Sequence, residues 1–145
     1  MAGLSTALKV LIKWGPVVFA AGRRALPYLK DNPAGQKFVQ TLAEQTAALP
    51  DRLSGEARAK RKIGAVQQSL AEAATLGINP AQYARWRAEL DELSRTVVLA
   101  KAANHRQRRS LLRQCERRLD QLVAEILPAL TTRHGDPPHA LPYSG

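Results

Sequence analysis

The fold is decided by residues 80–127, which read PAQYARWRAELDELSRTVVLAKAANHRQRRSLLRQCERRLDQLVAEIL. Apolar residues recur three and four apart on both sides of a polar gap at Asn104 and Arg108, which is the periodicity of one helix face. They are Tyr83, Trp86, Leu90, Leu93, Val97 and Ala100, then Leu111, Cys115, Leu119, Leu122 and Ile126. Because both halves share one phase, we favour a single helix about 70 Å long. A break near Asn104 is the alternative and would give a short three-helix bundle.

Cap residues predict the helices that precede this stretch. Asn32 and Pro33 form an N-cap followed by a first-turn proline, and that helix should run to about Leu49. Ser54 is the expected cap of a helix that continues through Leu76. Together these two helices are long enough to lie end to end, antiparallel, along the helix predicted for residues 80–127.

The turn between the last two predicted helices sets their register. Gly77 is suited to the left-handed residue that closes a helix, and Asn79 caps the next helix directly afterwards. A hairpin at Gly77 should bring position 58 near position 99 and position 52 near position 105.

Composition agrees with an all-α fold, because aromatic residues make up only 5% of the 145 residues and alanine is abundant. We expect a long antiparallel helical hairpin or a small three- to four-helix bundle, preceded by an amphipathic helix. The predicted divisions are an N-terminal segment at 1–30, a hairpin or bundle domain at 31–130, and a disordered tail at 131–145, which is rich in Pro, Gly and His.

The N-terminal segment is predicted to be one amphipathic helix over Leu4–Leu26, kinked at Pro16. Its apolar arc can pack on the bundle, lie on an anionic membrane or enter a groove of a partner protein, and all three readings stay open. The candidate membrane contacts are the apolar Leu4, Leu8, Leu11, Ile12, Trp14, Val18 and Phe19 and the cationic Lys9, Lys13, Arg23 and Arg24.

Membrane crossing and secretion are not expected from the sequence. The charge-free apolar run Trp14–Gly22 is much shorter than the roughly 20 residues that a transmembrane helix needs. Lys9 and Lys13 interrupt the apolar stretch that a signal peptide would require. The single Cys115 excludes an internal disulfide, so we expect a cytoplasmic protein that lies, in the membrane reading, at the inner face of the membrane.

Positive charge dominates the chain, with 22 Lys and Arg against 12 Asp and Glu and a net charge of +10. Such an excess attracts polyanions. The hairpin register should gather nine cations into one belt opposed only by Asp51 and Glu56, and Arg113 and Arg117 extend it along the same helical face as Arg106. The candidate anion-binding residues are Arg52, Arg58, Lys60, Arg61, Lys62, Lys101, Arg106, Arg108, Arg109, Arg113 and Arg117. A solvated basic face is the plainer interpretation.

Residues 70–86 also have some features of a helix-turn-helix motif around Gly77. In that reading Gln82 and Arg85 would face base edges and Trp86 the core. The helix that follows is far longer than a normal recognition helix, which weakens the reading.

No catalytic constellation, cofactor motif or metal-ligand spacing is found. Glu89, Asp91 and Glu92 could suggest paired carboxylates, but Arg85–Glu89, Arg87–Asp91 and Asp91–Arg95 are each four apart and are expected to be surface salt bridges. Cys115 lies on the apolar seam and reads as a core residue. His105, His134 and His139 share no metal-ligand spacing with it.

These observations predict a non-enzymatic interaction or adaptor protein of bacterial type that associates with an anionic surface. A peripheral membrane surface is the first expectation, and an acidic protein would satisfy the same belt. The alternative is a nucleic-acid-associated protein that uses residues 52–62 and 101–109. A homodimer is also conceivable, because a buried Asn104 could set the register of paired helices.

Overall fold

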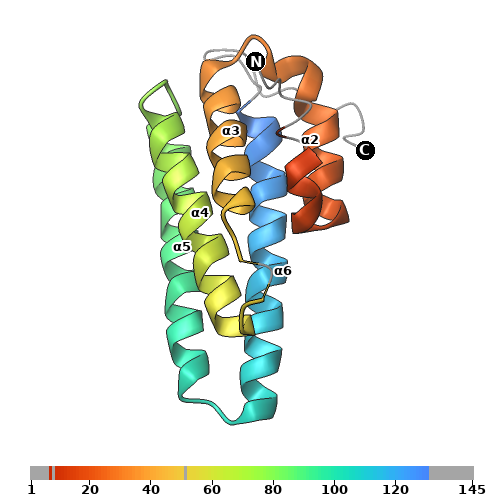
Figure 1. Ribbon diagram of the computed structural model, residues 1–145. Helices are drawn as coiled ribbons and strands as arrows, with labels where there is room; N and C mark the ends of the chain where they lie inside the picture. The colour runs from red at the N-terminus through yellow and green to blue at the C-terminus, as the bar shows by residue number, and fades with distance from the viewer. Residues whose placement is uncertain (1–6, 8, 51, 131–145) are drawn as a thin grey trace, which may run out of the picture.

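The structure, a computed structural model, is a bundle of helices and describes residues 7, 9–50 and 52–130 (Figure 1). No strand occurs in these ranges, so the predicted all-α fold is confirmed. In chain order the elements are the 3₁₀ helix η1 (Leu11–Trp14) and the α-helices α2 (Pro16–Leu29), α3 (Pro33–Ala47), α4 (Gly55–Ala74), α5 (Pro80–Lys101) and α6 (His105–Ala129).

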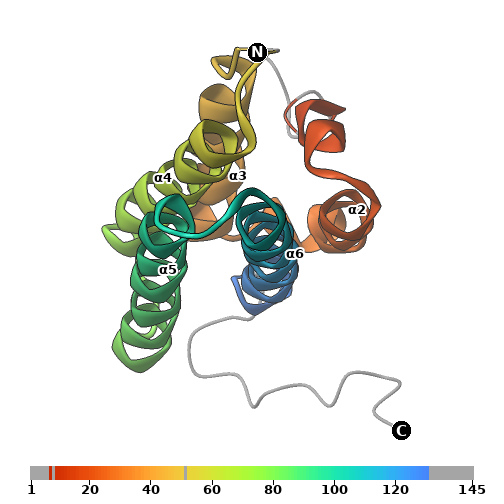
Figure 2. The same ribbon diagram turned by 90° about the horizontal axis from the view of Figure 1, so that it is seen from below.

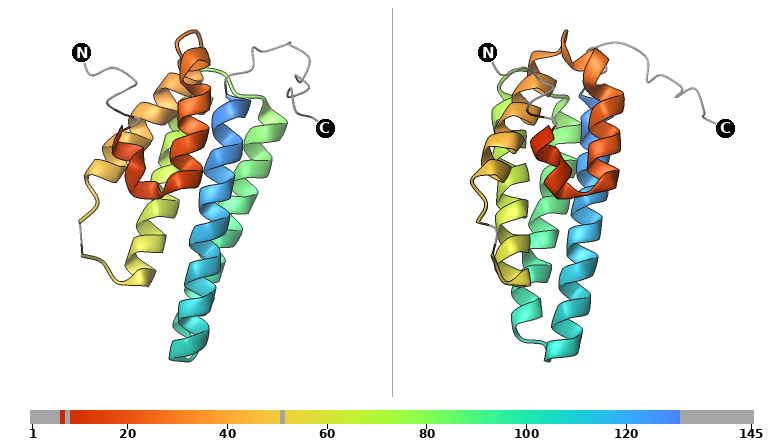
Figure 3. Two further views of the ribbon diagram at one scale, coloured as in Figure 1. Left: turned by 90° about the vertical axis from the view of Figure 1, so that its right-hand side faces the viewer. Right: turned by 45° about the vertical axis from the view of Figure 1, so that its right-hand side comes forward.

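Successive helices of the bundle run in opposite directions, and α2 of the N-terminal part packs against α6. From α2 to α6 each helix is antiparallel to the next, and α2 lies along the upper half of α6 in the same direction (Figures 1 and 3). Seen from below, α6 lies between α5 on one side and α2 on the other, with α3 and α4 across the core (Figure 2). The lower half of α6 therefore extends beyond the cover of α2.

The single helix predicted over 80–127 is wrong, because the chain turns back between α5 and α6. Asn104 is the N-cap of α6, and its side chain accepts a hydrogen bond from the Gln107 amide at 2.9 Å. Arg108 folds back and donates to two carbonyls at the end of α5 at 3.2 and 3.0 Å. The polar gap in the seam is thus a capped turn. Asn104 is exposed, so it cannot be the buried register-setting residue that the homodimer reading needed.

The N-terminal segment is also interrupted rather than kinked. Gly15 has a φ of 108°, a conformation that favours glycine, and it separates η1 from α2. Pro16 then occupies the first turn of α2, where its missing N–H costs nothing. The predicted kinked helix over Leu4–Leu26 is wrong for this reason, and Leu4 itself lies outside the described residues.

The other predicted caps are confirmed. Asn32, Ser54 and Asn79 each accept a hydrogen bond from a first-turn amide of the following helix. Gly77 has a φ of 108° in the turn between α4 and α5. These short polar side chains satisfy amide groups that have no partner within the helix.

The predicted hairpin register is confirmed by an ion pair between Lys101 and Glu56 at 3.3 Å. This pair has the same register as the predicted pairing of positions 58 and 99. The two helices are antiparallel along their length, whereas the second helix of a helix-turn-helix crosses the first steeply. The antiparallel packing of α4 and α5 therefore gives no support to the helix-turn-helix interpretation of residues 70–86.

The core consists of the predicted seam residues together with apolar residues of the N-terminal segment. The apolar seam of α4, which is Ile63, Val66, Leu70 and Ala73, is buried, as are most of the residues predicted for the seams of α5 and α6. Leu11, Trp14 and Val18 are buried in the same core. Of the three interpretations of the N-terminal apolar arc, packing on the bundle is therefore the one found in this structure.

Candidate anion-binding face

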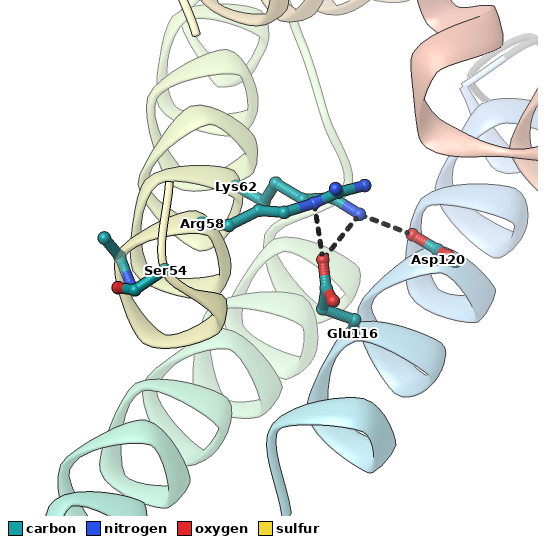
Figure 4. A network of polar contacts seen from close by, with 6 residues as sticks. Ser54, Arg58, Lys62, Glu116 and Asp120 are labelled. Atoms are coloured by element: carbon teal, nitrogen blue, oxygen red, sulfur yellow. Dashed lines mark hydrogen bonds and ion pairs between the residues drawn. The ribbon is translucent and has the colours of Figure 1, made fainter. Parts of the chain in front are cut away.

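A buried lysine lies where η1, α3, α4 and α6 meet. Lys62 is only 3% exposed, and its Nζ donates to Glu116 Oε1 and to Asp120 Oδ1, both at 3.3 Å. The same ammonium lies 4.4 Å from the centroid of the Trp14 ring. Figure 4 shows Arg58 and Lys62 extending from α4 toward the two carboxylates on α6. Burial of this charge is tolerated because the ammonium has three partners, namely the two carboxylates and the aromatic ring.

Trp14 is fixed in turn by a hydrogen-bond chain into α3. Its Nε1–H donates to Thr46 Oγ1 at 2.7 Å, and the Thr46 hydroxyl donates to the Leu42 carbonyl at 2.7 Å. Both residues are buried. The indole therefore joins η1 to α3 through its edge and to α4 through its face.

Arg58 completes this network, which we call the Lys62 junction (Arg58, Lys62, Glu116 and Asp120). Its Nε lies 3.1 Å from Glu116 Oε1, and 54% of its side chain is exposed. Two cations thus balance two carboxylates. Burial raises the pKa of Asp120 above its ordinary value, although the charge of Lys62 acts in the opposite direction.

The predicted belt is only partly available to a partner, because four of its cations are engaged within the protein. Arg58, Lys62 and Lys101 pair with carboxylates, and Arg108 is bonded to backbone carbonyls. The prediction that only Asp51 and Glu56 oppose the belt is wrong, since Glu116 and Asp120 do so as well. The break at Asn104 allows α6 to return along α4 and present these carboxylates. Asp51 lies outside the described residues.

The other predicted cations are exposed and have no ion pair among the residues that the structure describes. Arg52 precedes α4, Lys60 and Arg61 lie on it, and the rest lie on α6. The α6 set, which we call the arginine ridge, is Arg106, Arg109, Arg113 and Arg117. Residues three and four apart are neighbours on a helix, so these side chains form one continuous row.

The arginine ridge adjoins the Lys62 junction. Arg113 stands three residues before Glu116, and Arg117 stands three before Asp120, so each arginine is the helical neighbour of a junction carboxylate. Those carboxylates point toward α4 (Figure 4). The ridge and the exposed guanidinium of Arg58 therefore border the same face of the molecule, between α4 and α6.

A hollow of about 280 Å³ opens at the upper end of this face. It lies between η1, the segment joining α3 to α4, and α4 itself. Its lining combines cationic and apolar side chains with the buried pair of Trp14 and Thr46. The lining residues are Lys13, Trp14, Thr46, Leu49, Pro50, Leu53, Arg58 and Lys62. A second hollow of about 430 Å³ between α4 and α5 has a mixed lining that includes Arg87 and Asp91.

The predicted membrane contacts of the N-terminal segment are divided by the fold. Leu11, Trp14 and Val18 are buried in the bundle, so in this conformation a membrane cannot reach them. Ile12 is 58% exposed, and Phe19 is partly buried. The four cations Lys9, Lys13, Arg23 and Arg24 are exposed, as expected. Leu4 and Leu8 lie outside the described residues.

The remaining candidates, Glu89 and Cys115, make contacts within the bundle. Glu89 does not pair with Arg85 as expected; both of its oxygens accept from Arg118 of α6 at 2.7 Å. Cys115 is buried as expected, its Sγ lies 3.5 Å from the Leu93 carbonyl, and burial raises the pKa of the thiol. Within residues 9–50 and 52–130 no group of His, Cys, Asp and Glu is placed to hold a metal ion.

Comparison of the chain with models of protein families, with curated proteins and with solved structures finds no match. Among the described residues, no helix is both long enough and apolar enough to cross a membrane. The function must therefore be argued from the geometry of the face between α4 and α6.

Proposed function

We propose that this protein is a non-enzymatic interaction protein that binds the anionic cytoplasmic surface of a membrane through the face between α4 and α6. The observation that carries the proposal is the arginine ridge, in which four exposed arginines form one row without a carboxylate partner in the described part of the chain. Arg58 and Lys62, by contrast, are paired with carboxylates inside the protein. A row of free arginines is therefore suited to an external anion.

Exposed aliphatic side chains beside these cations favour a lipid surface. Leu49 and Leu53 are partly exposed at the hollow, close to Arg58 and Lys13, and Ile12 precedes Lys13 in η1. Cations together with aliphatic side chains are the composition that binds the interface of an anionic bilayer. Each Lys or Arg near such a surface contributes about 1 kcal/mol.

This proposal differs from membrane binding by the whole N-terminal helix. The arc formed by Leu11, Trp14 and Val18 stays in the core, and the bundle binds as it is folded. Binding then depends on the ridge rather than on the insertion of η1 and α2.

The first prediction concerns vesicle co-sedimentation of the full chain. Replacing the four ridge arginines by Gln should weaken binding to phosphatidylglycerol-containing vesicles by on the order of a thousandfold, at about 1 kcal/mol for each charge removed. Vesicles of phosphatidylcholine alone should bind neither protein.

The matched control removes the same charge elsewhere. Arg24, Lys37, Arg85 and Arg95 are exposed, and no ion pair is found for them among the described residues. Their replacement by Gln should weaken binding much less than the ridge variant. If the two quadruple variants bound the vesicles equally, the effect would be bulk charge and the proposed face would be rejected.

A phosphate backbone is the second candidate partner, and the regular spacing of the ridge arginines favours it. Such a row can follow successive phosphates without any apolar contact. Binding of duplex DNA should then lose roughly 0.9 log units per phosphate contact for each tenfold rise in salt, and the ridge variant should flatten that slope. A gel shift of DNA without vesicle binding would favour this candidate over the membrane.

A further inference from the structure

We propose that the hollow between η1, the α3–α4 segment and α4 binds one monoanionic phosphodiester headgroup together with the first methylene groups of its acyl chain. The inference rests on the proposed function and names the lipid class that the face selects. The hollow brings uncommitted cationic donors and an apolar wall together in one space of about 280 Å³.

The donors available to a ligand belong to Arg58 and Lys13. The Lys62 ammonium is fully occupied by two carboxylates and the Trp14 ring. Arg58 uses its Nε for Glu116, and its two terminal nitrogens have no partner among the described residues. A guanidinium fork matches phosphate oxygens. Lys13 is exposed on the opposite rim, with no ion pair among the described residues.

The charge around the hollow favours an anion with one negative charge. Among the described groups that line the hollow or pair with its lining, Lys62 and Arg58 are balanced by Glu116 and Asp120, which leaves Lys13 in excess. A phosphodiester carries one negative charge and would be neutralised. A phosphate monoester approaches two charges at neutral pH and would be neutralised only in part.

The apolar part of the lining provides a place for hydrocarbon next to the cations. Leu49, Pro50 and Leu53 line the hollow, with Leu49 and Leu53 partly exposed. Ligand pockets commonly hold roughly 300–1,000 Å³, so this space suits a headgroup and a short stretch of chain rather than a whole lipid. The rest of the acyl chains would stay in the bilayer.

The floor of the hollow is held rigid before any ligand arrives. Trp14 is fixed by Thr46 at its edge, and Lys62 is fixed over its face. Binding therefore needs little ordering of the protein, which is the condition under which a small site can be selective.

The second prediction uses Trp14 as the reporter. In a full chain carrying Trp86→Phe, titration with dihexanoyl phosphatidylglycerol below its micelle concentration should change the Trp14 emission saturably. The substitution breaks no hydrogen bond in the described structure, because the buried Trp86 Nε1 has no partner there.

Three probes distinguish the sources of the anion. Dihexanoyl phosphatidylcholine has the same chains and phosphodiester but no net charge, and inorganic phosphate has no chains. The phosphatidylcholine probe should bind at least about tenfold more weakly than the phosphatidylglycerol probe, because its choline cation would lie among the cationic donors of the site. Inorganic phosphate should also bind at least about tenfold more weakly, since about two buried methylene groups are enough for a tenfold effect. Equally tight binding of inorganic phosphate would overturn the proposal and indicate a site for free phosphate.

Two lysines of the N-terminal segment provide the matched pair of variants. Lys13→Gln should weaken the lipid probe by about tenfold or more, as loss of a charge-assisted hydrogen bond does. Lys9→Gln should leave it unchanged, and equal effects of the two substitutions would overturn the site.

Vesicle sedimentation separates this site from the proposed function. Wild-type protein that pellets with anionic vesicles but gives no saturable response to the soluble lipid would reject the hollow alone. A saturable response in protein that does not pellet would reject the membrane function and leave the site standing.

Discussion

The Lys62 junction and the arginine ridge contain the same kinds of residues and use them in opposite ways. Around the junction, α4 carries a run of four basic residues in five positions, and α6 begins with a similar run. Lys62 points inward because it shares the helix face of Ala59 and Val66, both of which are buried. The ridge arginines fall on a face of α6 that none of the described helices covers. The rotation of each helix, rather than its composition, decides whether a cation stabilises the fold or remains available.

This contrast has an energetic side. A cation in the core must be surrounded by acceptors, and removing one member leaves the others with an uncompensated buried charge. An exposed cation is already solvated, so its removal changes stability little. The two regions should therefore separate cleanly when stability and binding are measured on the same variants.

The third prediction has the largest expected effect on stability. Lys62→Met should lower the free energy of unfolding by about 3–5 kcal/mol, because Glu116 and Asp120 lose their buried partner. Urea denaturation followed by circular dichroism would measure the change.

Lys60→Met is the control for that prediction, since Lys60 is exposed on the same helix. It should change the free energy of unfolding by less than about 0.5 kcal/mol. Similar losses for the two methionine variants would mean that the junction does not hold the bundle together. Adding Glu116→Gln and Asp120→Asn to Lys62→Met should restore part of the stability.

The fourth prediction sharpens the comparison through pH. Burial raises the pKa of Asp120 above its ordinary value of 3.8, so the folded state holds this proton more tightly than the unfolded chain does. The stability that Asp120 contributes is therefore fully present below pH 3.8 and is lost as the pH rises through the raised pKa.

Urea denaturation of the wild type and Asp120→Asn at a series of pH values isolates this contribution. The free energy of unfolding of the wild type, minus that of the variant, should fall with rising pH across this window and then level off. A difference that rose with pH would show that attraction to Lys62 outweighs burial.

The fifth prediction has the smallest expected effect on stability. Arg113→Gln and Arg117→Gln should each change the free energy of unfolding by less than about 0.5 kcal/mol, because both side chains are exposed. A larger loss in thermal or urea denaturation would assign the ridge a structural role and remove it from the binding face.

Much of the fold could be predicted from local signals. Asn32, Ser54 and Asn79 are short polar residues placed directly before apolar periodicity, and each caps the helix expected of it. Gly77 set a register that the Lys101–Glu56 pair reproduces. These features depend only on neighbouring residues, which is why sequence reasoning could find them.

The turn at Asn104 was only the alternative in the sequence analysis, because periodicity does not detect it. Two antiparallel helices that face one core can show seams in the same phase across their turn, and α5 and α6 do so. Asn104 resembles the other caps but is followed by His105 instead of proline. The capping signal was therefore weaker there than at Asn32 or Asn79.

The junction was missed because it depends on helices that are not consecutive. A turn fixes the register of the helices it joins, but the register of α4 against α6 follows from the packing of the whole bundle. One signal was present: Lys62 lies in the apolar phase of α4, between Ala59 and Val66. A lysine in that position predicts a buried carboxylate partner, although it cannot say which one.

The packing of α2 against α6 has a consequence for the order in which the chain can fold during synthesis. Helices α3, α4, α5 and α6 each pack extensively on a helix adjacent in sequence, whereas the most extensive contact of α2 is with α6, the described helix farthest from it along the chain. Until α6 leaves the ribosome, α2 lacks this cover, and a loop over most of the described chain must close before the two helices can pack. The segment that contains η1 and α2 is thus made before α6 but can be fully buried only after α6, so its apolar side chains are less covered in the interval.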